Sequence, residues 1–451
     1  MQALIHDRSG LRIAILALVV LLGVAVSWGM ARNGAPALPS ERSGEDLTRL
    51  GLSADAQIQT FQDRLRSDPE DWQSYSQLGL AYLQKAREVG DPTYYQKAEE
   101  ALNQALSHQP DEYVAVSGMG ALALARHQFQ EALEWGERAR RINPDRAYAY
   151  GVIVDAQVEL GQYDEAVETL QTMVDLHPDM SSFTRVSYLR ELHGDTSGAL
   201  EMMQSAVDSG VPNAENTAWT RTQLGNLYFN MGDLENAEAQ YLLTLQNWPD
   251  YLYAMAGLAR VRAAQGQLDD AIELMKRTTE IMPLPDFVIL LGDLYQANGQ
   301  TEMAGQQYRL VGAIETLYRA NGVDMDMEIA LFNADHRKNL EDTLELARQA
   351  YANRPSIHAA DVLAWALYQT GAYEEAHTYS DLALELGTQD ALKFFHAGMI
   401  AYQLGDHMQA RTDLEQALEL NPHFSILYAD EAQQTLDALP LQAEGGNNDS
   451  P

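Results

Sequence analysis

The chain has 451 residues and contains no cysteine. That absence excludes disulfide bonds, thiolate zinc sites, iron–sulfur clusters, CxxC redox chemistry and a cysteine nucleophile. Positive charge is also scarce, with 30 Lys and Arg residues against 65 Asp and Glu residues and a formal net charge of -35. Because so acidic a surface repels phosphate backbones, we expect no nucleic-acid partner. Hydrophobic residues make up 46% of the chain, which is enough for a folded core.

The sequence also lacks the common motifs of enzyme and cofactor sites. It contains no glycine-rich phosphate loop, no HExxH, no GxSxG and no DxDxDG loop. We therefore expect no catalytic residue, no cofactor and no metal ion. One alternative stays open, a metal-dependent or enzymatic protein that uses the region of His336, His358 and His396. These histidines, with Asp335 and Asp361, fall on helices of adjacent units and could converge.

One long apolar run lies near the N-terminus. Ile13–Ala31 spans 19 residues with a single clearly polar side chain. At about 1.5 Å per residue, a helix of this length nearly matches a bilayer core of about 30 Å. Trp28 near its far end suits a membrane interface. We expect a transmembrane anchor over residues 13–31 and a cytoplasmic tail over residues 1–12.

A cleavable signal peptide is the alternative for this segment. Its processing site would be the small residues at Gly29-Met30-Ala31 or Ala35-Pro36-Ala37. The apolar run is longer than a usual signal core of roughly 7–15 residues, which favours a retained anchor. A linker of turn-forming residues is expected over 32–53. The expected location is the cell membrane, single-pass, with the rest of the chain outside the cytoplasm.

From residue 72 onward the sequence repeats with a period of 34 residues. Pro110, Pro144 and Pro178 follow one another at this interval. Apolar and small residues three and four apart between the prolines are typical of helices that pack along one face. Proline at the end of each unit stops its second helix, and glycine near the middle suits a left-handed helix cap. These glycines are Gly161, Gly232, Gly266, Gly299, Gly371 and Gly405.

A short motif that recurs inside the units indicates which type of repeat they form. A Leu-Gly-like pair is followed three residues later by an aromatic or small residue, as in Leu78-Gly79 with Tyr82, Leu224-Gly225 with Tyr228, Leu291-Gly292 with Tyr295, and Ala397-Gly398 with Ala401. This pattern resembles the tetratricopeptide repeat family. The resemblance implies an all-α fold, a right-handed superhelical solenoid of about ten helix hairpins over residues 72–422. We expect capping helices over 54–69 and 423–439, and a disordered tail over 440–451.

Two units depart from the pattern in length. The first contains an insertion, Arg87–Thr93, which predicts a longer turn between its helices. In the seventh, the second helix is predicted to continue past its usual end, through Leu317-Tyr318-Arg319 to near Gly322.

In this repeat family the first helix of each unit lines the concave face of the superhelix. The second, fifth, ninth and twelfth places of each unit are expected to point there. The predicted partner-binding groove therefore contains Tyr148, Asp155, Arg185, Trp219, Asn226, Tyr253, Arg260, Asp293, Asp361 and Trp365. Exposed aromatic residues mixed with single charges suit the capture of a peptide or helix. Each aromatic residue could instead pack between neighbouring units.

These features predict a membrane-anchored scaffold that binds a protein or peptide partner in its groove. Anchored relatives of this kind serve envelope assembly or cytochrome c maturation, and Leu65–Pro69 followed by Trp72 is similar to the start of the repeat domain of the latter. Anchored lipopolysaccharide-assembly relatives carry a cysteine-rich tail, which argues against them here. The sequence gives no indication of an oligomeric state.

Overall fold

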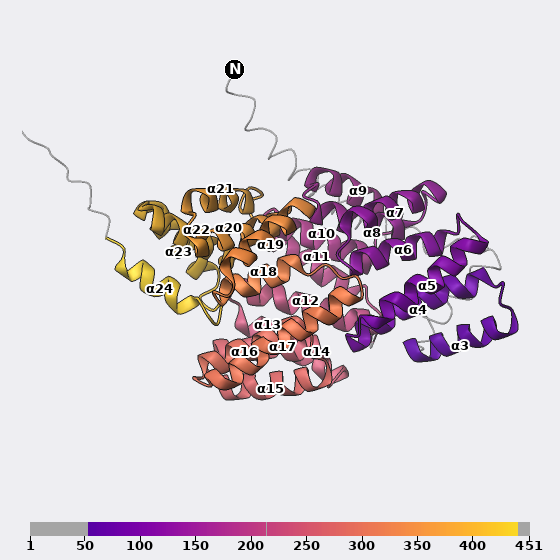
Figure 1. Ribbon diagram of the computed structural model, residues 1–451, viewed down its shortest axis with the longest axis horizontal. Coiled ribbons are helices and arrows are strands. Elements are labelled where there is room, and N and C mark those ends of the chain that lie inside the picture. Colours follow the sequence, from indigo (N-terminus) through magenta and orange to yellow (C-terminus); the bar gives the residue numbers. More distant parts are fainter. Residues whose placement is uncertain (1–52, 213, 441–451) are drawn as a thin grey trace, which may run out of the picture.

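The computed structural model of the protein describes residues 53–212 and 214–440. The regular structure of these residues consists of 22 helices, α3 to α24, without strands (Figure 1). The anchor predicted over 13–31, its signal-peptide alternative, the flanking tail and linker, and the C-terminal tail after 440 lie outside them. Among the described helices, none combines the length and the apolarity needed to span a bilayer.

Twenty of the helices form ten consecutive hairpins, which confirms the predicted all-α solenoid. The hairpins are α4 (Trp72–Val89) with α5 (Thr93–His108), α6 (Tyr113–Ala125) with α7 (Phe129–Ile142), α8 (Ala147–Glu159) with α9 (Tyr163–Leu176), α10 (Met180–Leu192) with α11 (Thr196–Asp208), α12 (Glu215–Asn230) with α13 (Leu234–Asn247), α14 (Leu252–Ala264) with α15 (Leu268–Ile281), α16 (Pro285–Ala297) with α17 (Thr301–Ala320), α18 (Asp326–Asp335) with α19 (Leu340–Asn353), α20 (Ile357–Thr370) with α21 (Tyr373–Ala383), and α22 (Ala391–Leu404) with α23 (His407–Leu420). Single helices flank them, α3 (Ala54–Ser67) and α24 (Ala429–Ala438). The long second helix of the seventh hairpin, α17, is found as predicted.

The Leu-Gly motif leaves room for a large side chain between hairpins. Tyr241 of α13 is fully buried, and its ring lies where a Cβ atom at Gly225 or Gly257 would stand. Its hydroxyl donates to Asn226 Oδ1 at 2.7 Å. Glycine in the first helix and tyrosine in the second are therefore one packing unit, which the next first helix completes through Gly257.

The array turns back on itself, so that its later hairpins lie against its early ones (Figure 1). Ile357 N–H donates to the Tyr163 hydroxyl at 2.8 Å, although the two residues are 194 positions apart. Asn421 Nδ2 donates to the Phe229 carbonyl, 192 positions away, at 2.8 Å. The nearly constant separation shows that one superhelical turn has closed on the next.

We call this contact the seam. It joins the turns inside the first five hairpins to loops between later hairpins: Gly90 to Met282, His127 to Asp324, Gly161 to Pro355, Gly194 to Gly387, and Gly232 to Leu420.

Two separate constraints favour glycine at the seam, the backbone conformation and the lack of space for a Cβ atom. Gly161 and Gly194 have φ of 69° and 76°, which favours glycine, and a Cβ atom there would overlap the carbonyl oxygen of Pro355 or Gly387. Gly266 and Gly299 occupy the same place in hairpins that have no further turn above them, and a Cβ atom at either would meet nothing within 4 Å. The array thus holds two classes of hairpin turn, covered and free.

The seventh and eighth hairpins join differently from the others. Their helices α17 and α18 do not pack side by side as consecutive helices elsewhere in the described array do. Large side chains fill the junction instead, with the ring of Tyr308 4.3 Å from that of His336 and 5.8 Å from that of Phe332. Val323 and Met325 of the connecting loop are buried with them.

Alanine at the two classes of turn should separate backbone strain from seam packing. All four variants Gly161→Ala, Gly194→Ala, Gly266→Ala and Gly299→Ala place a side chain in the left-handed region, at about 1–2 kcal/mol each. The two seam variants add overpacking, which typically costs about 1–3 kcal/mol. Urea unfolding followed by circular dichroism should therefore give lower midpoints for the seam pair. Equal losses at all four positions would contradict the seam.

Candidate functional site

The first helices of the hairpins line the inner side of the curved array. Neighbouring first helices pack against one another, as α6 does with α8, α12 with α14 and α20 with α22. We define the inner wall by five side chains of these first helices: Tyr148, Asp155, Arg185, Trp219 and Arg260. All five are among the residues that the repeat pattern predicts for the groove.

The helices α8 and α10 contribute an aromatic ring beside a closed ion pair. Tyr148 is 51% exposed, and the loss of surrounding water raises the pKa of its hydroxyl. Arg185 grips Asp155 with two bonds, Nε to Oδ1 at 2.7 Å and a terminal nitrogen to Oδ2 at 2.6 Å. It also donates to the carbonyl of Ser181 at 2.9 Å. The charge of Arg185 is therefore already compensated.

The helices α12 and α14 contribute a tryptophan and an uncompensated guanidinium. Trp219 is 41% exposed. Arg260 lies over the ring of Phe229 at 4.1 Å, and its pKa is lowered by burial. Within the residues that the structure describes, no carboxylate pairs with it. Because a desolvated cation without a counterion is unfavourable, Arg260 is the inner-wall group most in need of an anionic partner.

Two further predicted groove residues serve the packing of the same hairpins. Asn226 accepts the Tyr241 hydroxyl and donates to Gln223 Oε1 at 3.1 Å. Tyr253 is partly buried, with its ring 5.7 Å from that of Tyr251 and 5.6 Å from that of Phe287. Both lie beside the inner wall, and each already has intramolecular partners.

The prediction is wrong for the last groove residues. Trp365 is 1% exposed, stacks on His396 at 4.2 Å and donates to Asp335 Oδ1 at 2.9 Å. Asp361 is buried and bonds to His396 Nδ1 at 3.0 Å. The reason is the C-terminal segment, since Tyr428 packs edge-on against Trp365 at 5.5 Å and covers this stretch.

Asp293 also has internal partners rather than an open surface. It accepts the Tyr308 hydroxyl at 2.8 Å and lies 2.9 Å from His336 Nε2. It therefore belongs to the junction between α16, α17 and α18.

The three histidines of the alternative hypothesis occupy separate environments. His336 is bonded to Asp293, His396 to Asp361, and His358 Nδ1 lies 3.2 Å from Lys393 Nζ. Burial and the charge of Lys393 lower the pKa of His358 to about 3, so the imidazole is neutral at physiological pH. No group of three or more potential metal ligands occurs within residues 53–212 and 214–440. The geometry provides no shared site for the three rings.

Between α10 and α20 the structure reveals a polar cluster that the sequence did not predict. The Tyr188 hydroxyl lies 3.1 Å from His358 Nε2, and Lys393 Nζ donates to Asp390 Oδ2 at 2.9 Å. Burial raises the pKa of the nearby Glu191 to about 7, and the Asp390 charge adds to this effect. The contact joins residues 170 positions apart, so no local pattern announces it.

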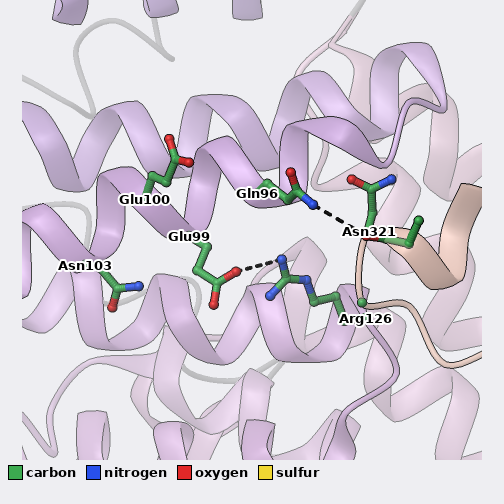
Figure 2. A pocket seen from close by; sticks show the side chains of 8 residues that line it. Gln96, Glu99, Glu100, Asn103, Arg126 and Asn321 are labelled. Atoms are coloured by element: carbon green, nitrogen blue, oxygen red, sulfur yellow. Dashed lines mark hydrogen bonds and ion pairs between the residues drawn. The ribbon is translucent and has the colours of Figure 1, made fainter.

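An open polar pocket of about 460 Å³ lies where α5 meets the end of α17. Figure 2 shows Gln96, Glu99, Glu100 and Asn103 along one side and Arg126 beside them. Arg126 pairs with Glu99 at 2.8 Å, while its buried Nε has no hydrogen-bond partner. The pocket is a gap in the packing next to the seam, and its lining is too polar for a typical apolar ligand.

Fold and inner wall together define a helical-repeat scaffold. Models of the tetratricopeptide repeat match residues 86–147, 123–190, 216–283 and 394–424. These matches, together with the helix hairpins, show that the chain contains tetratricopeptide repeats.

Similar proteins are distant. Cellulose synthase operon protein C of Pseudomonas fluorescens (strain SBW25) is 24% identical over 249 residues, 52% of this chain and 19% of that protein. The CTR9 homolog of Arabidopsis thaliana is 22% identical over 265 residues, 56% of this chain and 24% of that protein. The chain thus spans a quarter or less of the curated relatives it matches.

The solved structures that are similar to this chain are also distant in sequence. A thermophilic TPR protein of Thermus thermophilus is 23% identical, with a TM-score of 0.37 over 44% of this chain and 99% of that one. Human IFIT1 is 17% identical, with a TM-score of 0.47 over 76% of this chain and 81% of that one.

Glu191→Gln tests the burial of an inner carboxyl group. The pKa of Glu191 in the folded protein, about 7, lies above the ordinary value of 4.5. The protonated carboxyl group therefore stabilises the fold below pH 4.5, and this stabilisation is lost as the pH rises through about 7. The amide avoids this loss. We expect the variant to be more stable than the parent at pH 8, on the order of 2 kcal/mol, with the advantage shrinking towards pH 5. Urea unfolding at both pH values measures it. The same gain in the exposed control Glu165→Gln would contradict this interpretation.

Proposed function

We propose that the protein is a membrane-anchored scaffold that binds another protein through the inner wall of its repeat array. The observation that carries this proposal is the presence of Trp219 and Arg260 on the neighbouring first helices α12 and α14. Tryptophan and arginine are the side chains most enriched among interface hot spots. One is 41% exposed, and the other lacks a counterion within the described part of the chain.

The partner is best matched by an amphipathic helix or extended peptide that carries some acidic residues. A carboxylate would compensate Arg260, and an apolar side chain would cover Trp219 and the exposed ring of Tyr148. A nucleic acid is disfavoured because the whole chain carries a net charge of -35. The fold itself favours a non-catalytic role, since repeat arrays of this kind offer extended binding surfaces.

The biological setting is proposed from the sequence. The apolar run Ile13–Ala31 would hold the protein in the cell membrane, with the repeats on the outer side. In that position the scaffold would serve assembly in the envelope or of cytochrome c-type proteins. Crosslinking in the native membrane, followed by mass spectrometry of what is captured, would identify the partner.

Alanine substitutions test the binding surface. Arg260→Ala and Trp219→Ala should each weaken capture of the crosslinked partner by about 2 kcal/mol or more, roughly thirtyfold in affinity. The matched control is Arg262→Ala, two residues further along α14, where the side chain pairs with Glu238 at 2.6 Å. Melting temperatures of all variants separate binding from folding. Intact capture by Arg260→Ala, or loss by Trp219→Ala through unfolding alone, would contradict the proposal.

Membrane extraction tests the anchor. Alkaline carbonate should leave the full-length protein in the membrane pellet, because a retained apolar helix resists extraction. Release of the repeat array into the soluble fraction, with a new N-terminus near Arg32 or Leu38, would instead show a cleaved signal peptide.

A further inference from the structure

The seam contains a cluster of partly buried charges in which two carboxylate oxygens lack a hydrogen-bond partner. Arg354 lies 2.8 Å from Glu328 Oε1 and 3.7 Å from Glu159 Oε2, with its guanidinium 5.4 Å from the ring centroid of Phe129. His127 Nδ1 approaches Glu328 at 3.7 Å. The second oxygen of Glu328 and the Oε2 atom of Glu159 are buried without a hydrogen-bond partner. We call these four charged or titratable residues the Arg354 cluster.

Closing the seam therefore has a definite cost. Burial raises the pKa of Glu159 despite the nearby guanidinium, so desolvation outweighs attraction at this carboxyl. His127 adds backbone strain, because its φ of 58° lies in the left-handed region that glycine fills in most other hairpins. That strain places His127 Nδ1 2.7 Å from the Asp324 carbonyl. Hydrogen bonds across the seam and apolar contacts, such as Ile357 in the core of α8 to α11, offset these costs.

The part of the array that bears on the seam is joined to the rest by side chains rather than by side-by-side helix packing. The helices α18 to α24 follow the loop 321–325, at the junction where α17 and α18 do not pack side by side. The open pocket of Figure 2 lies beside this loop and is lined by Asn321 and Gly322. Movement of these helices as a body would break the seam contacts and disturb the buried cluster at the junction, which includes Val323, Met325 and Phe332.

We propose that α18 to α24 act as a clasp, which opens and closes over the inner wall and whose opening is favoured by the Arg354 cluster. In the closed state His358 of the clasp contacts the hydroxyl of Tyr188 on α10. Tyr188 lies three residues along the same helix from Arg185 of the inner wall. An incoming helix reaches the whole of this surface when the clasp is open. The inference rests on the proposed function for its purpose, because the inner wall is the proposed partner surface. The motion itself can be measured without a partner.

Pulsed electron paramagnetic resonance can measure the distance between two spin labels attached to introduced cysteines. The chain has no native cysteine that would also be labelled. Spin labels at Glu165→Cys on α9 and Glu374→Cys on α21 report on the two sides of the seam, and both positions are exposed. We expect one short distance for the closed clasp and a minor longer one for the open clasp.

Two sets of variants should move the populations in opposite directions. Glu159→Gln removes the carboxylate whose burial is least compensated, keeps Glu328 as the partner of Arg354, and should reduce the long-distance fraction at least about fivefold. Gly161→Val with Gly194→Val should make the long distance dominant. The control pair Gly266→Val with Gly299→Val introduces the same backbone strain at turns that meet nothing within 4 Å, and should resemble the parent.

The outcomes separate the clasp from the proposed function. Distance distributions that stay unchanged in both Glu159→Gln and the Gly161→Val, Gly194→Val pair, or that change as much in the control pair, overturn the clasp. If the distances shift as expected while Arg260→Ala and Trp219→Ala capture the partner normally, the clasp stands and the inner wall is not the partner surface. If capture depends on those residues and the distances never move, the binding surface stands and the clasp fails.

Discussion

The structure depends on the contact between successive superhelical turns. A helix hairpin is stabilised mainly by its neighbours along the chain, and an array of such units is open to bending along its whole length. Here the turns of the first five hairpins meet loops nearly two hundred residues later, and the bonds from Ile357 to Tyr163 and from Asn421 to Phe229 repeat at almost the same interval. This regular spacing fixes the pitch of the superhelix. It also brings the first helices α10 and α20 into contact through Tyr188 and His358.

The chemistry of that inner surface follows from its confinement. Side chains that would be solvated on a flat face lose water when the array closes, which raises the pKa of Glu191 and Tyr148 and lowers that of Arg260. Where a countercharge is available the array uses it, as Asp155 does for Arg185. Arg260 has no such countercharge among the described residues, and the proposed function depends on this difference. In the Arg354 cluster at the seam, the charges are likewise only partly compensated.

The hairpins could be predicted from the sequence because their signals are local. A 34-residue period, the Leu-Gly motif and terminal prolines indicate most of the helix pairs. The burial of Trp365 could not be predicted, since Tyr428 covers it from 63 residues further along the chain. One signal for the seam was nevertheless present. Loops that remain free carry aspartate after proline, whereas covered loops do not: Asp111, Asp145, Asp179 and Asp250 contrast with Leu284, Ser356 and His423. A carboxylate at the covered loops would lie close to backbone carbonyl groups and away from water.

The central claim, that the seam holds two superhelical turns together, is tested most directly by hydrogen exchange at the Ile357 amide. This residue is the first of α20, where an amide has no partner within its own helix and ordinarily exchanges fast. Its bond to the Tyr163 hydroxyl predicts marked protection, and Tyr163→Phe should abolish that protection at Ile357 while leaving amides in the middle of α20 unchanged. Exchange at Ile357 as fast in the parent protein as at other first-turn amides would contradict the seam.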